Sequence, residues 1–374
     1  MKGSRSTLTA FALLLALAGI VRAQQSANDY VMSAIGAMQK GDNRKAIDDL
    51  TEAIKLRPDY ADAYMLRSNI RVQVSDTKGA ISDLDKFLQL RPTSGTGYYQ
   101  RAIYRLTDQD TKGALADLDS AIGNGEKGDY VYEMRAELRS QGGDFKGSLE
   151  DLDAAVKLNP DNPNYYLRRA WICSKLDKPD LAFSDLNHAI AWYEAGPQKP
   201  PPKEPEKPKP PPNLAAKEDA PKSTPATDAL ATVGITTETK NPSADDPEMV
   251  PMIAGAYVQR GSIYSERGNS AAALADFSKA IKLLPRDAGA YYQRSMELEG
   301  KADLAGALAD IDEAIKLEPR IGRYRTEHGV ILLLQGKTAE SQVDFDMLVK
   351  ADPEWQKYID GRISEARKKM SHIP

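Results

Sequence analysis

The sequence predicts an all-α fold, an α-solenoid of eight 34-residue helix-turn-helix units followed by a C-terminal capping helix. The first observation is a column of tyrosines at steps of 34 residues: Tyr30, Tyr64, Tyr98, Tyr132 and Tyr166, then Tyr257 and Tyr291. The second is a column of prolines with the same step: Pro58 and Pro92, then Pro285, Pro319 and Pro353. The third is a column of small residues: Ala46, Ala80, Ala114, Ser148 and Ala182, then Ala273, Ala307 and Ser341. A strict period of this length indicates stacked repeats, which start at residues 27, 61, 95, 129 and 163 and again at 254, 288 and 322.

The N-terminal segment has the pattern of an export signal. Lys2 and Arg5 precede an apolar run from Leu8 to Val21, which is shorter than the roughly 18 residues that span a bilayer. Val21-Arg22-Ala23 fits a cleavage site, so we expect residues 1–23 to be a signal peptide and the mature chain to start at Gln24. An uncleaved N-terminal anchor is the alternative. The prediction favours the periplasm over the extracellular space, with no membrane insertion after cleavage.

Each repeat is predicted to form two helices. In the second repeat, Ala80, Ile81, Leu84, Phe87 and Leu88 recur at steps of three or four residues, which is typical of an amphipathic helix. Pro92 follows and ends that helix, because proline cannot donate to the helical hydrogen-bond ladder. We therefore expect five repeats over residues 27–196 and three over residues 254–355.

Two further segments complete the predicted organisation. Residues 197–253 break the period and hold 14 of the 23 prolines, so we expect a disordered or extended insertion. It is either a plain spacer or a docking sequence for another protein. Residues 356–370 regain helical periodicity and end in Arg367-Lys368-Lys369, as expected of a polar capping helix.

The repeats resemble the tetratricopeptide repeat family. The fourth repeat carries the family's pattern of aromatic, small, aliphatic and proline positions in Tyr132, Ala136, Ser148, Leu152, Ala155 and Pro160. The resemblance implies a right-handed superhelix whose concave groove is lined by the first helix, helix A, of each repeat. Arg325 replaces the tyrosine of the last repeat, and Glu126 and Glu194 replace the terminal proline of two others. We expect looser joints at these positions.

Carried over residue by residue, the resemblance places a partner-binding groove on helix A. The residues are Met65, Asn69, Tyr99, Ile103, Leu106, Tyr130, Glu133, Glu137, Leu167, Trp171, Tyr292, Met296, Val330 and Leu333. Tyr, Trp and Met are enriched at protein interfaces, and Glu133 and Glu137 would favour a basic partner. The alternative is that some of these side chains pack only between neighbouring A helices. The lysine that clamps a C-terminal carboxylate in the family's chaperone-tail receptors is missing, which excludes that function.

Composition argues against several other classes of protein. With 50 basic and 54 acidic residues the net charge is −4, and a nucleic-acid binder would show a basic excess. One cysteine, Cys173, and three separated histidines, His188, His328 and His372, form no local metal motif. No phosphate loop, HExxH or GxSxG motif is present. We therefore expect no enzymatic activity and no metal or cofactor, and we expect Cys173 to be a small core residue.

These observations predict an exported, non-enzymatic adaptor that binds a protein or peptide in its groove. A second hypothesis is an envelope spacer or assembly protein in which residues 197–253 recognise the partner. A cryptic hydrolase or an enzyme accessory subunit is a remote third.

One acid and one base recur at fixed positions and predict how the repeats join. Position 23 of every repeat is aspartate: Asp49, Asp83, Asp117, Asp151, Asp185, Asp276, Asp310 and Asp344. Position 7 reads Ser33, Arg67, Arg101, Arg135, Arg169, Arg260, Arg294 and His328. We expect each aspartate to pair with position 7 of the next unit, so that Asp185 meets Arg260 across the insertion and Asp344 meets Arg362 of the capping helix. Repeats five and six would then stack directly.

Overall fold

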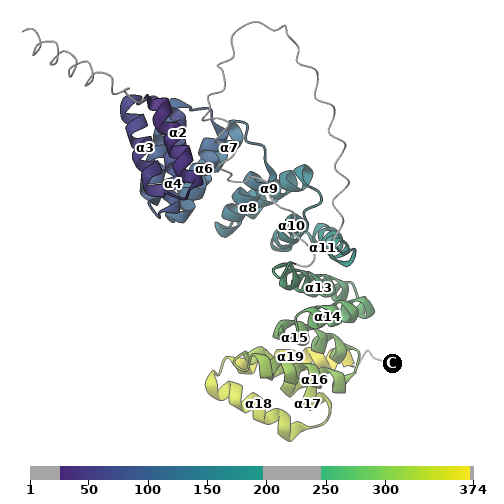
Figure 1. Cartoon of the computed structure of the whole chain (residues 1–374). Helices are drawn as coiled ribbons and strands as arrows, with labels where there is room; N and C mark the ends of the chain where they lie inside the picture. The colour runs from purple at the N-terminus through teal and green to yellow at the C-terminus, as the bar shows by residue number, and fades with distance from the viewer. Residues whose placement is uncertain (1–25, 197–245, 371–374) are drawn as a thin grey trace, which may run out of the picture. The chain divides into compact units, whose positions relative to one another are not determined.

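The computed structural model describes residues 26–196 and 246–370, which form 17 helices and no strand (Figure 1). The predicted all-α solenoid of paired helices is confirmed. The helices are α2 (Ala27–Gln39), α3 (Asn43–Leu56), α4 (Ala61–Gln73), α5 (Thr77–Leu90), α6 (Gly95–Thr107), α7 (Thr111–Gly123), α8 (Asp129–Gln141), α9 (Phe145–Leu158), α10 (Pro163–Lys175), α11 (Pro179–Glu194), α13 (Met249–Glu266), α14 (Ser270–Leu283), α15 (Ala288–Gly300), α16 (Leu304–Leu317), α17 (Gly322–Leu334), α18 (Thr338–Ala351) and α19 (Trp355–Met370).

The described residues form two compact units, and the boundary falls between the two helices of the fourth repeat. The first unit ends at Gly142 and holds α2 to α8; the second begins at Gly143 and holds α9 to α19. Within each unit the two helices of a repeat pack as a hairpin, for example α4 with α5 and α15 with α16. The second helix, helix B, then packs on helix A of the next repeat, as α5 does on α6 and α14 on α15. The predicted signal peptide, residues 1–23, and residues 197–245 of the predicted insertion lie outside the described residues.

The turn between the two helices has the same backbone conformation in every repeat. Its fifteenth residue has a positive φ in all eight repeats: Gly41, Ser75, Gln109, Gly143, Asp177, Gly268, Ala302 and Gly336. An aspartate or asparagine follows in six repeats, and its side chain accepts a hydrogen bond from the third backbone N–H of helix B. The left-handed residue reverses the chain and the cap satisfies an end group of the helix, so both features fix where helix B begins.

Small residues set the distance between the two helices of a repeat. In the third repeat Ala102, Ala114 and Ala121 are fully buried at the contact of α6 with α7. In the sixth repeat the larger Phe277 faces Gly261, where an added Cβ would lie 2.6 Å from the ring. A phenylalanine on helix B is therefore accommodated by a glycine on helix A, and the total volume at the contact is kept.

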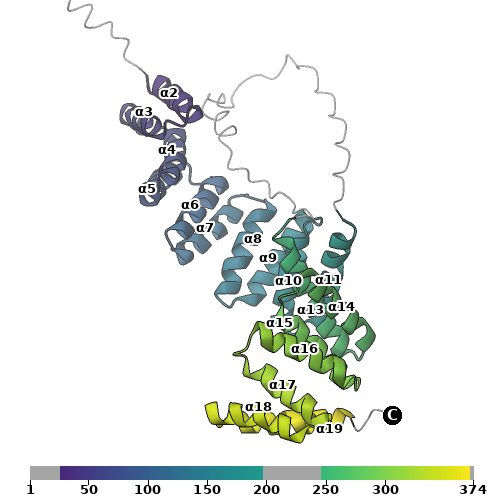
Figure 2. The ribbon, with the colours of Figure 1, turned by 60° about the horizontal axis from the view of Figure 1, so that its bottom comes forward.

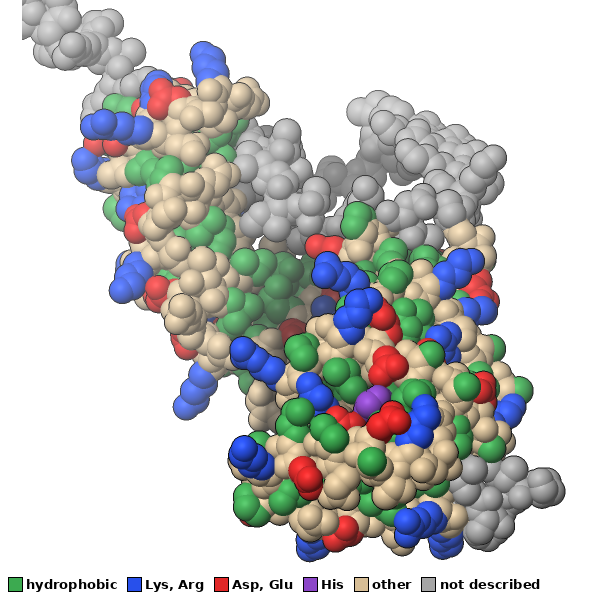
Figure 3. Space-filling model, turned by 90° about the horizontal axis from the view of Figure 1, so that it is seen from below, with side chains coloured by type: hydrophobic (Ala, Val, Ile, Leu, Met, Phe, Trp, Pro, Cys, Tyr) green, Lys and Arg blue, Asp and Glu red, His purple; other side chains and the backbone are tan. Residues whose placement is uncertain are grey.

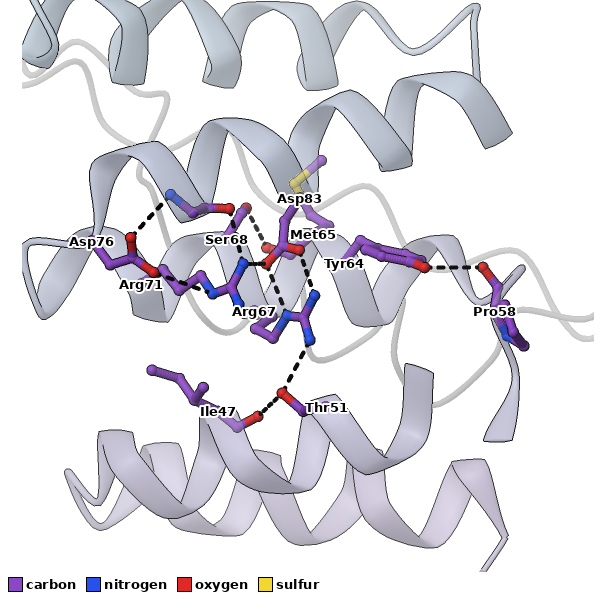
Figure 4. A network of polar contacts seen from close by, with 11 residues as sticks. Ile47, Thr51, Pro58, Tyr64, Met65, Arg67, Ser68, Arg71, Asp76 and Asp83 are labelled. Atoms are coloured by element: carbon purple, nitrogen blue, oxygen red, sulfur yellow. Dashed lines mark hydrogen bonds and ion pairs between the residues drawn. The ribbon is translucent and has the colours of Figure 1, made fainter. Parts of the chain in front are cut away.

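Each arginine at position 7 binds the aspartate at position 23 of its own repeat (Figure 4). Arg67 donates from Nε and Nη2 to the two oxygens of Asp83, at 2.9 and 2.6 Å. Its Nη1 donates across the joint to Thr51 Oγ1 of the preceding repeat, at 3.0 Å. The same two-oxygen pairing, at 2.6–2.9 Å, joins Arg101 to Asp117, Arg169 to Asp185, Arg260 to Asp276 and Arg294 to Asp310.

The predicted pairing of each aspartate with the next repeat is therefore wrong. Asp185 binds Arg169 of its own repeat and not Arg260. Positions 7 and 23 face each other across the hairpin, and a planar guanidinium matches a carboxylate best through two parallel hydrogen bonds. The link between repeats runs instead from Nη1 to position 25 of the preceding repeat, as in Arg101 to Asp85 at 2.7 Å.

The two ends of the array solve the same problem with other residues. In the first repeat, where position 7 is Ser33, Lys45 binds Asp49 at 2.8 Å and also donates to Ser33. In the last repeat, Asp344 binds His328 Nδ1 at 2.5 Å and lies 3.6 Å from Arg325. Arg325, which replaces the family tyrosine, thus adds a cation beside the weaker base. The predicted pair of Asp344 with Arg362 is absent from the contacts of the described residues, because Arg362 binds two glutamates instead.

Repeats five and six nevertheless stack directly. Helix α13 packs on α11 in the way that α4 packs on α3. Arg260 Nη1 donates to Asn187 Oδ1, at position 25 of the preceding repeat, at 2.8 Å. Tyr257 and Lys279 both donate to Glu194, so this residue, expected to mark a looser joint, fastens the two repeats together. Helix α13 begins at Met249, so its first turn comes from residues that the sequence assigned to the insertion.

Candidate functional site

The predicted groove residues of the first unit lie on α4, α6 and α8, and most are only partly accessible. Met65, Asn69 and Tyr99 are buried, whereas Ile103 and Tyr130 are half-buried, as are Glu133 and Glu137. We call the face formed by the predicted groove residues the A-helix surface. In this unit part of that face is packing between neighbouring A helices, which is the alternative that the sequence left open.

Asn69 has a structural role that its predicted place in a groove did not suggest. Its Oδ1 accepts hydrogen bonds from Gln100 Nε2 and from Tyr104 Oη, the latter at 2.9 Å. All three side chains are buried, and Gln100 and Tyr104 belong to α6 of the next repeat. This polar cluster ties α4 to α6 and uses the amide oxygen that a partner would otherwise contact.

Tyr99 and Tyr130 form the aromatic part of the A-helix surface in the first unit. Their ring centroids lie 4.8 Å apart with the planes tilted by 58°. Burial, with the nearby carboxylates of Glu126 and Glu133, raises the pKa of Tyr99 to about 12. Tyr99 is therefore a neutral phenol at physiological pH, and the pair presents a mostly apolar contact next to acidic side chains.

Trp171 on α10 is the only one of the predicted groove residues whose side chain is exposed. It is 41% exposed, although its neighbour along the helix, Leu167, is buried. The edge of Trp171 meets Phe145 at the start of α9, with ring centroids 5.9 Å apart, and Lys175 lies over the indole at 5.2 Å. A large aromatic ring that is fixed by a neighbour and still open to solvent is the type of side chain that anchors protein interfaces.

Helix α19 covers Tyr292 and Met296, the predicted groove residues of the seventh repeat. Arg362 of α19 lies 3.5 Å from Met296 Sδ through Nη2, and both predicted residues are half-buried. The ring of Tyr292 also packs on Tyr324 of the next repeat, at 5.2 Å between centroids. The A-helix surface of repeats seven and eight is therefore occupied by a segment of the same chain.

Beneath α19 lies a buried charged cluster that the sequence analysis missed. Glu299 of α15 and Glu327 of α17 are at most 1% exposed, and both bind Arg362, which is 6% exposed. Burial and the neighbouring Glu299 raise the pKa of Glu327 to about 9. The two glutamates do not share a repeat position, so no column in the sequence indicates them. A signal that could have been used is the arginine in the capping helix.

A surface pocket of about 510 Å³ lies between α18 and α19. Its apolar lining comes from Leu333, Phe345, Val349, Ile359 and Ile363. The pocket is open to solvent because α19 leaves part of α18 uncovered. Figure 3 shows hydrophobic side chains scattered among charged ones over the C-terminal repeats.

The remaining reactive side chains are engaged in packing. Cys173 is buried, and burial raises the pKa of its thiol to about 11, which keeps it protonated and unreactive. His188 stacks on Tyr166 with ring centroids 3.8 Å apart. In residues 26–196 and 246–370 no three His, Cys, Asp or Glu side chains come together as a set that could hold a metal ion. Across the same two ranges, none of the helices combines the length and the apolar character that crossing a membrane requires.

The fold and the A-helix surface define a class, the helix-hairpin repeat proteins. Profiles of the tetratricopeptide repeat match residues 31–95 and 133–200, and a second profile of that repeat matches residues 254–287. The chain therefore contains tetratricopeptide repeats. No curated protein matches the sequence.

Solved tetratricopeptide structures show the same type of fold at low sequence identity. PilW, a type IV pilus biogenesis factor, is 14% identical, with 72% of this chain and 98% of that chain covered and a TM-score of 0.47. YrrB, described as having an unusual peptide-binding site, is 19% identical, with 64% and 95% covered and a TM-score of 0.43. A repeat protein from Parabacteroides merdae is 16% identical, with 82% and 99% covered and a TM-score of 0.43. These likenesses concern the fold alone.

Proposed function

We propose that the protein is a non-enzymatic scaffold that binds a peptide or a partner protein on its A-helix surface. The observation that carries the proposal is Trp171, an aromatic side chain that is exposed on helix A while Phe145 holds its edge. An exposed indole contributes nothing to the core of the repeat, whereas a partner that buries it gains a large apolar contact. Lys175 beside the ring adds a cation that an acidic group of the partner would meet.

The test is a binding measurement with one substitution and one matched control. The full-length protein is used to capture its partner from the source cells, the partner is identified by mass spectrometry, and its Kd is measured by titration calorimetry. Trp171→Ala should weaken binding by about 2 kcal/mol or more, which is roughly 30-fold in Kd. Leu158→Ala is the control, because Leu158 is a large exposed side chain of the same unit, 49% exposed, at the far end of α9. Equal affinity of the two variants would refute the proposal.

Tyr99 belongs in a separate variant. Its ring is buried against Tyr130, so Tyr99→Ala removes packing as well as a contact surface. Trp171→Ala, in contrast, should leave the far-UV circular dichroism spectrum unchanged. The double substitution is informative only when the spectrum shows that the helices of the first unit remain folded.

Residues 197–253 provide the competing hypothesis, in which the proline-rich segment recognises the partner. A chain that lacks residues 197–245 separates the two ideas, since the stacking of α13 on α11 does not depend on the sequence removed. Retained binding supports the A-helix surface. Lost binding, with Trp171→Ala neutral in the full-length chain, supports the segment.

We propose in addition that the protein is exported, with the periplasm as its place of action. The support is the basic and then apolar pattern of residues 1–23 and the single cysteine, which cannot mispair within the chain. Edman sequencing of protein from the exported fraction should start at Gln24. A sequence that starts at Met1 would contradict cleavage.

A further inference from the structure

Helix α19 does not continue the regular stacking of the repeats. In an internal helix A the third and tenth residues are buried against the preceding helix B, as Tyr324 and Ile331 are in α17. The same two places in α19 are Tyr358 and Glu365, and both are exposed. Ile359 and Ala366, one residue further on, are the buried ones. One residue along a helix corresponds to a rotation of about 100°, so α19 presents a different face to the array.

The rotated helix lies over the A helices and not simply behind α18. It contacts α17 and reaches past it to α15, and its contact with α18 leaves the open pocket described above (Figures 1 and 2). Tyr292 and Met296 of α15, the predicted binding residues of the seventh repeat, are among the side chains near it. A helix in this place occupies the surface that a partner of repeats seven and eight would use.

A single arginine anchors α19 to this surface. Arg362 Nε and Nη2 donate to the two oxygens of Glu327, at 2.9 and 2.8 Å, and Nη2 also donates to Glu299 Oε2. Two carboxyl groups thus face one guanidinium group. Glu299 Oε1 and Arg362 Nη1 are buried without a hydrogen-bond partner, so the cluster is not fully satisfied.

A cluster of this kind contributes specificity more than stability. Removing charges from water costs about as much free energy as their pairing returns, so an apolar contact would stabilise a permanent cap at least as well. Glutamates that are buried by the arriving helix do, however, reject any helix that lacks a cation at the right place. Burial and Glu299 hold a proton on Glu327 by raising its pKa to about 9. The groups that face the cluster are Tyr292 and Glu299 from α15, Glu327 from α17, and Tyr358, Arg362 and Glu365 from α19. The pair therefore presents about one negative charge to one arginine.

We propose that the A-helix surface of repeats seven and eight is a receptor for an amphipathic helix that carries one arginine among apolar residues, and that α19 is its intramolecular occupant. A partner helix of this chemistry binds by displacing α19. The inference rests on the proposed function, in which the A-helix surface binds partners, and it names the partner chemistry and the competitor at one end of that surface.

The test uses the full-length chain and a fluorescein-labelled peptide of residues 355–370. Fluorescence anisotropy should show that Arg362→Ala binds the peptide at least 10-fold more tightly than the wild type does, because the resident helix no longer competes. Arg367→Ala is the matched control, since Arg367 is an exposed arginine on the same helix, and it should bind like the wild type. A peptide with alanine in place of the arginine should not bind. Equal affinity of the peptide for the two arginine variants would overturn the proposal.

A second measurement keeps the test decisive if Arg362→Ala fails to fold. Excess unlabelled peptide is added to the wild-type chain, and hydrogen exchange is followed by mass spectrometry. Exchange in α19 should become faster while α15 stays protected; unchanged exchange in α19 would mean that it is a fixed cap. A wild-type chain that elutes as a dimer through exchange of α19 would overturn the intramolecular occupant. Because the probe is the chain's own helix, these outcomes do not depend on Trp171 or on the identity of the natural partner.

Discussion

Arg294 in α15 and Arg362 in α19 hold the same position of the repeat, yet they bind different kinds of partner. Arg294 binds Asp310 of its own helix B through two oxygens and reaches Ser278 of the preceding repeat. Helix α19 is the last helix of the described residues, so Arg362 has no aspartate of its own repeat to bind. It turns to Glu299 and Glu327 on the A helices. The comparison teaches that the following helix, and not the repeat position, directs the arginine.

The largest effect should come from breaking the internal pair. Arg294→Ala leaves Asp310 nearly buried without a cation, and the loss of one partner of such a pair costs about 3 kcal/mol. His328→Ala should cost only about 1 kcal/mol, because Arg325 remains near Asp344. Urea unfolding followed by circular dichroism measures both. Arg286→Ala, an exposed arginine of the same unit, serves as the control with a change below about 0.5 kcal/mol. Equal losses in the first two variants would contradict the difference drawn between internal and terminal repeats.

A second prediction compares the same steric contact in the middle and at the end of the array. An added Cβ would lie 2.6 Å from Phe277 in Gly261→Ala and 2.5 Å from Phe345 in Gly329→Ala. Overpacking of a confined core costs about 1–3 kcal/mol. Gly261 lies between repeats on both sides, whereas Phe345 borders the open pocket next to α19 and can shift. We expect about 2 kcal/mol for Gly261→Ala and less for Gly329→Ala, measured by thermal unfolding; the reverse order would show that the terminal joint is as tight as an internal one.

The stability of the terminal repeat should fall as the pH rises, unlike that of the arginine-paired repeats. The hydrogen bond to Asp344 raises the pKa of His328, so the stability it contributes is complete below the ordinary histidine pKa and is lost as the pH rises through the raised value. Glu327, with a pKa of about 9, keeps a proton in the folded state that the unfolded chain has already released, so stability declines between the ordinary glutamate pKa and about pH 9.

Both titrations therefore have the same sign and can be separated by substitution. Hydrogen exchange in α17 and α19 should be slower at pH 5.5 than at pH 8.5 after correction for the intrinsic exchange rate. His328→Arg should remove the part of the slope near neutral pH, and Glu327→Gln the part at higher pH. A wild-type protein without any slope would contradict both assignments.

The smallest effect concerns the turn between helices A and B. Ala302 has φ 60° where Gly336 has φ 80° in the next repeat. A left-handed conformation is unfavourable for alanine and costs glycine nothing sterically. Ala302→Gly should stabilise the seventh repeat by about 0.5 kcal/mol, and Gly336→Ala should destabilise the eighth by about 1 kcal/mol. Differential scanning calorimetry would show opposite shifts of the melting temperature; shifts of the same sign would rule out this reading of the turn.

The register of the repeats could be predicted from the sequence because each column has a direct physical cause. Pro92 ends a helix, and Ala102 permits a close helix contact, wherever such residues recur. The pairing of the charges could not be predicted in the same way. An arginine at position 7 is 16 residues from the aspartate of its own repeat and 18 residues from that of the preceding one, so spacing alone hardly separates the two partners. Only the facing of the two helices within a hairpin decides between them.

The candidate site was predictable in its location and less so in its accessibility. Trp171 is exposed on helix A, where the repeat pattern placed it, but Met65 and Asn69 are buried by the neighbouring helix. Burial depends on how closely adjacent A helices approach, and this distance is set by residues of two repeats at once. The covering of Tyr292 and Met296 had one sequence signal that was not used: the apolar residues Ile359 and Ala366 are shifted by one position from the internal repeats.

The joint between α11 and α13 has a consequence for cooperativity. In a linear array, the free energy of each repeat is coupled only to that of its immediate neighbours, so stability is transmitted step by step. Arg260 with Asn187 and Tyr257 with Glu194 supply that coupling between two repeats separated by a long stretch of chain. For thermodynamics the fifth and sixth repeats are adjacent, although the order of synthesis separates them. Local opening that begins at α19 can therefore pass through α13 to α11, with the covalent connection playing no part.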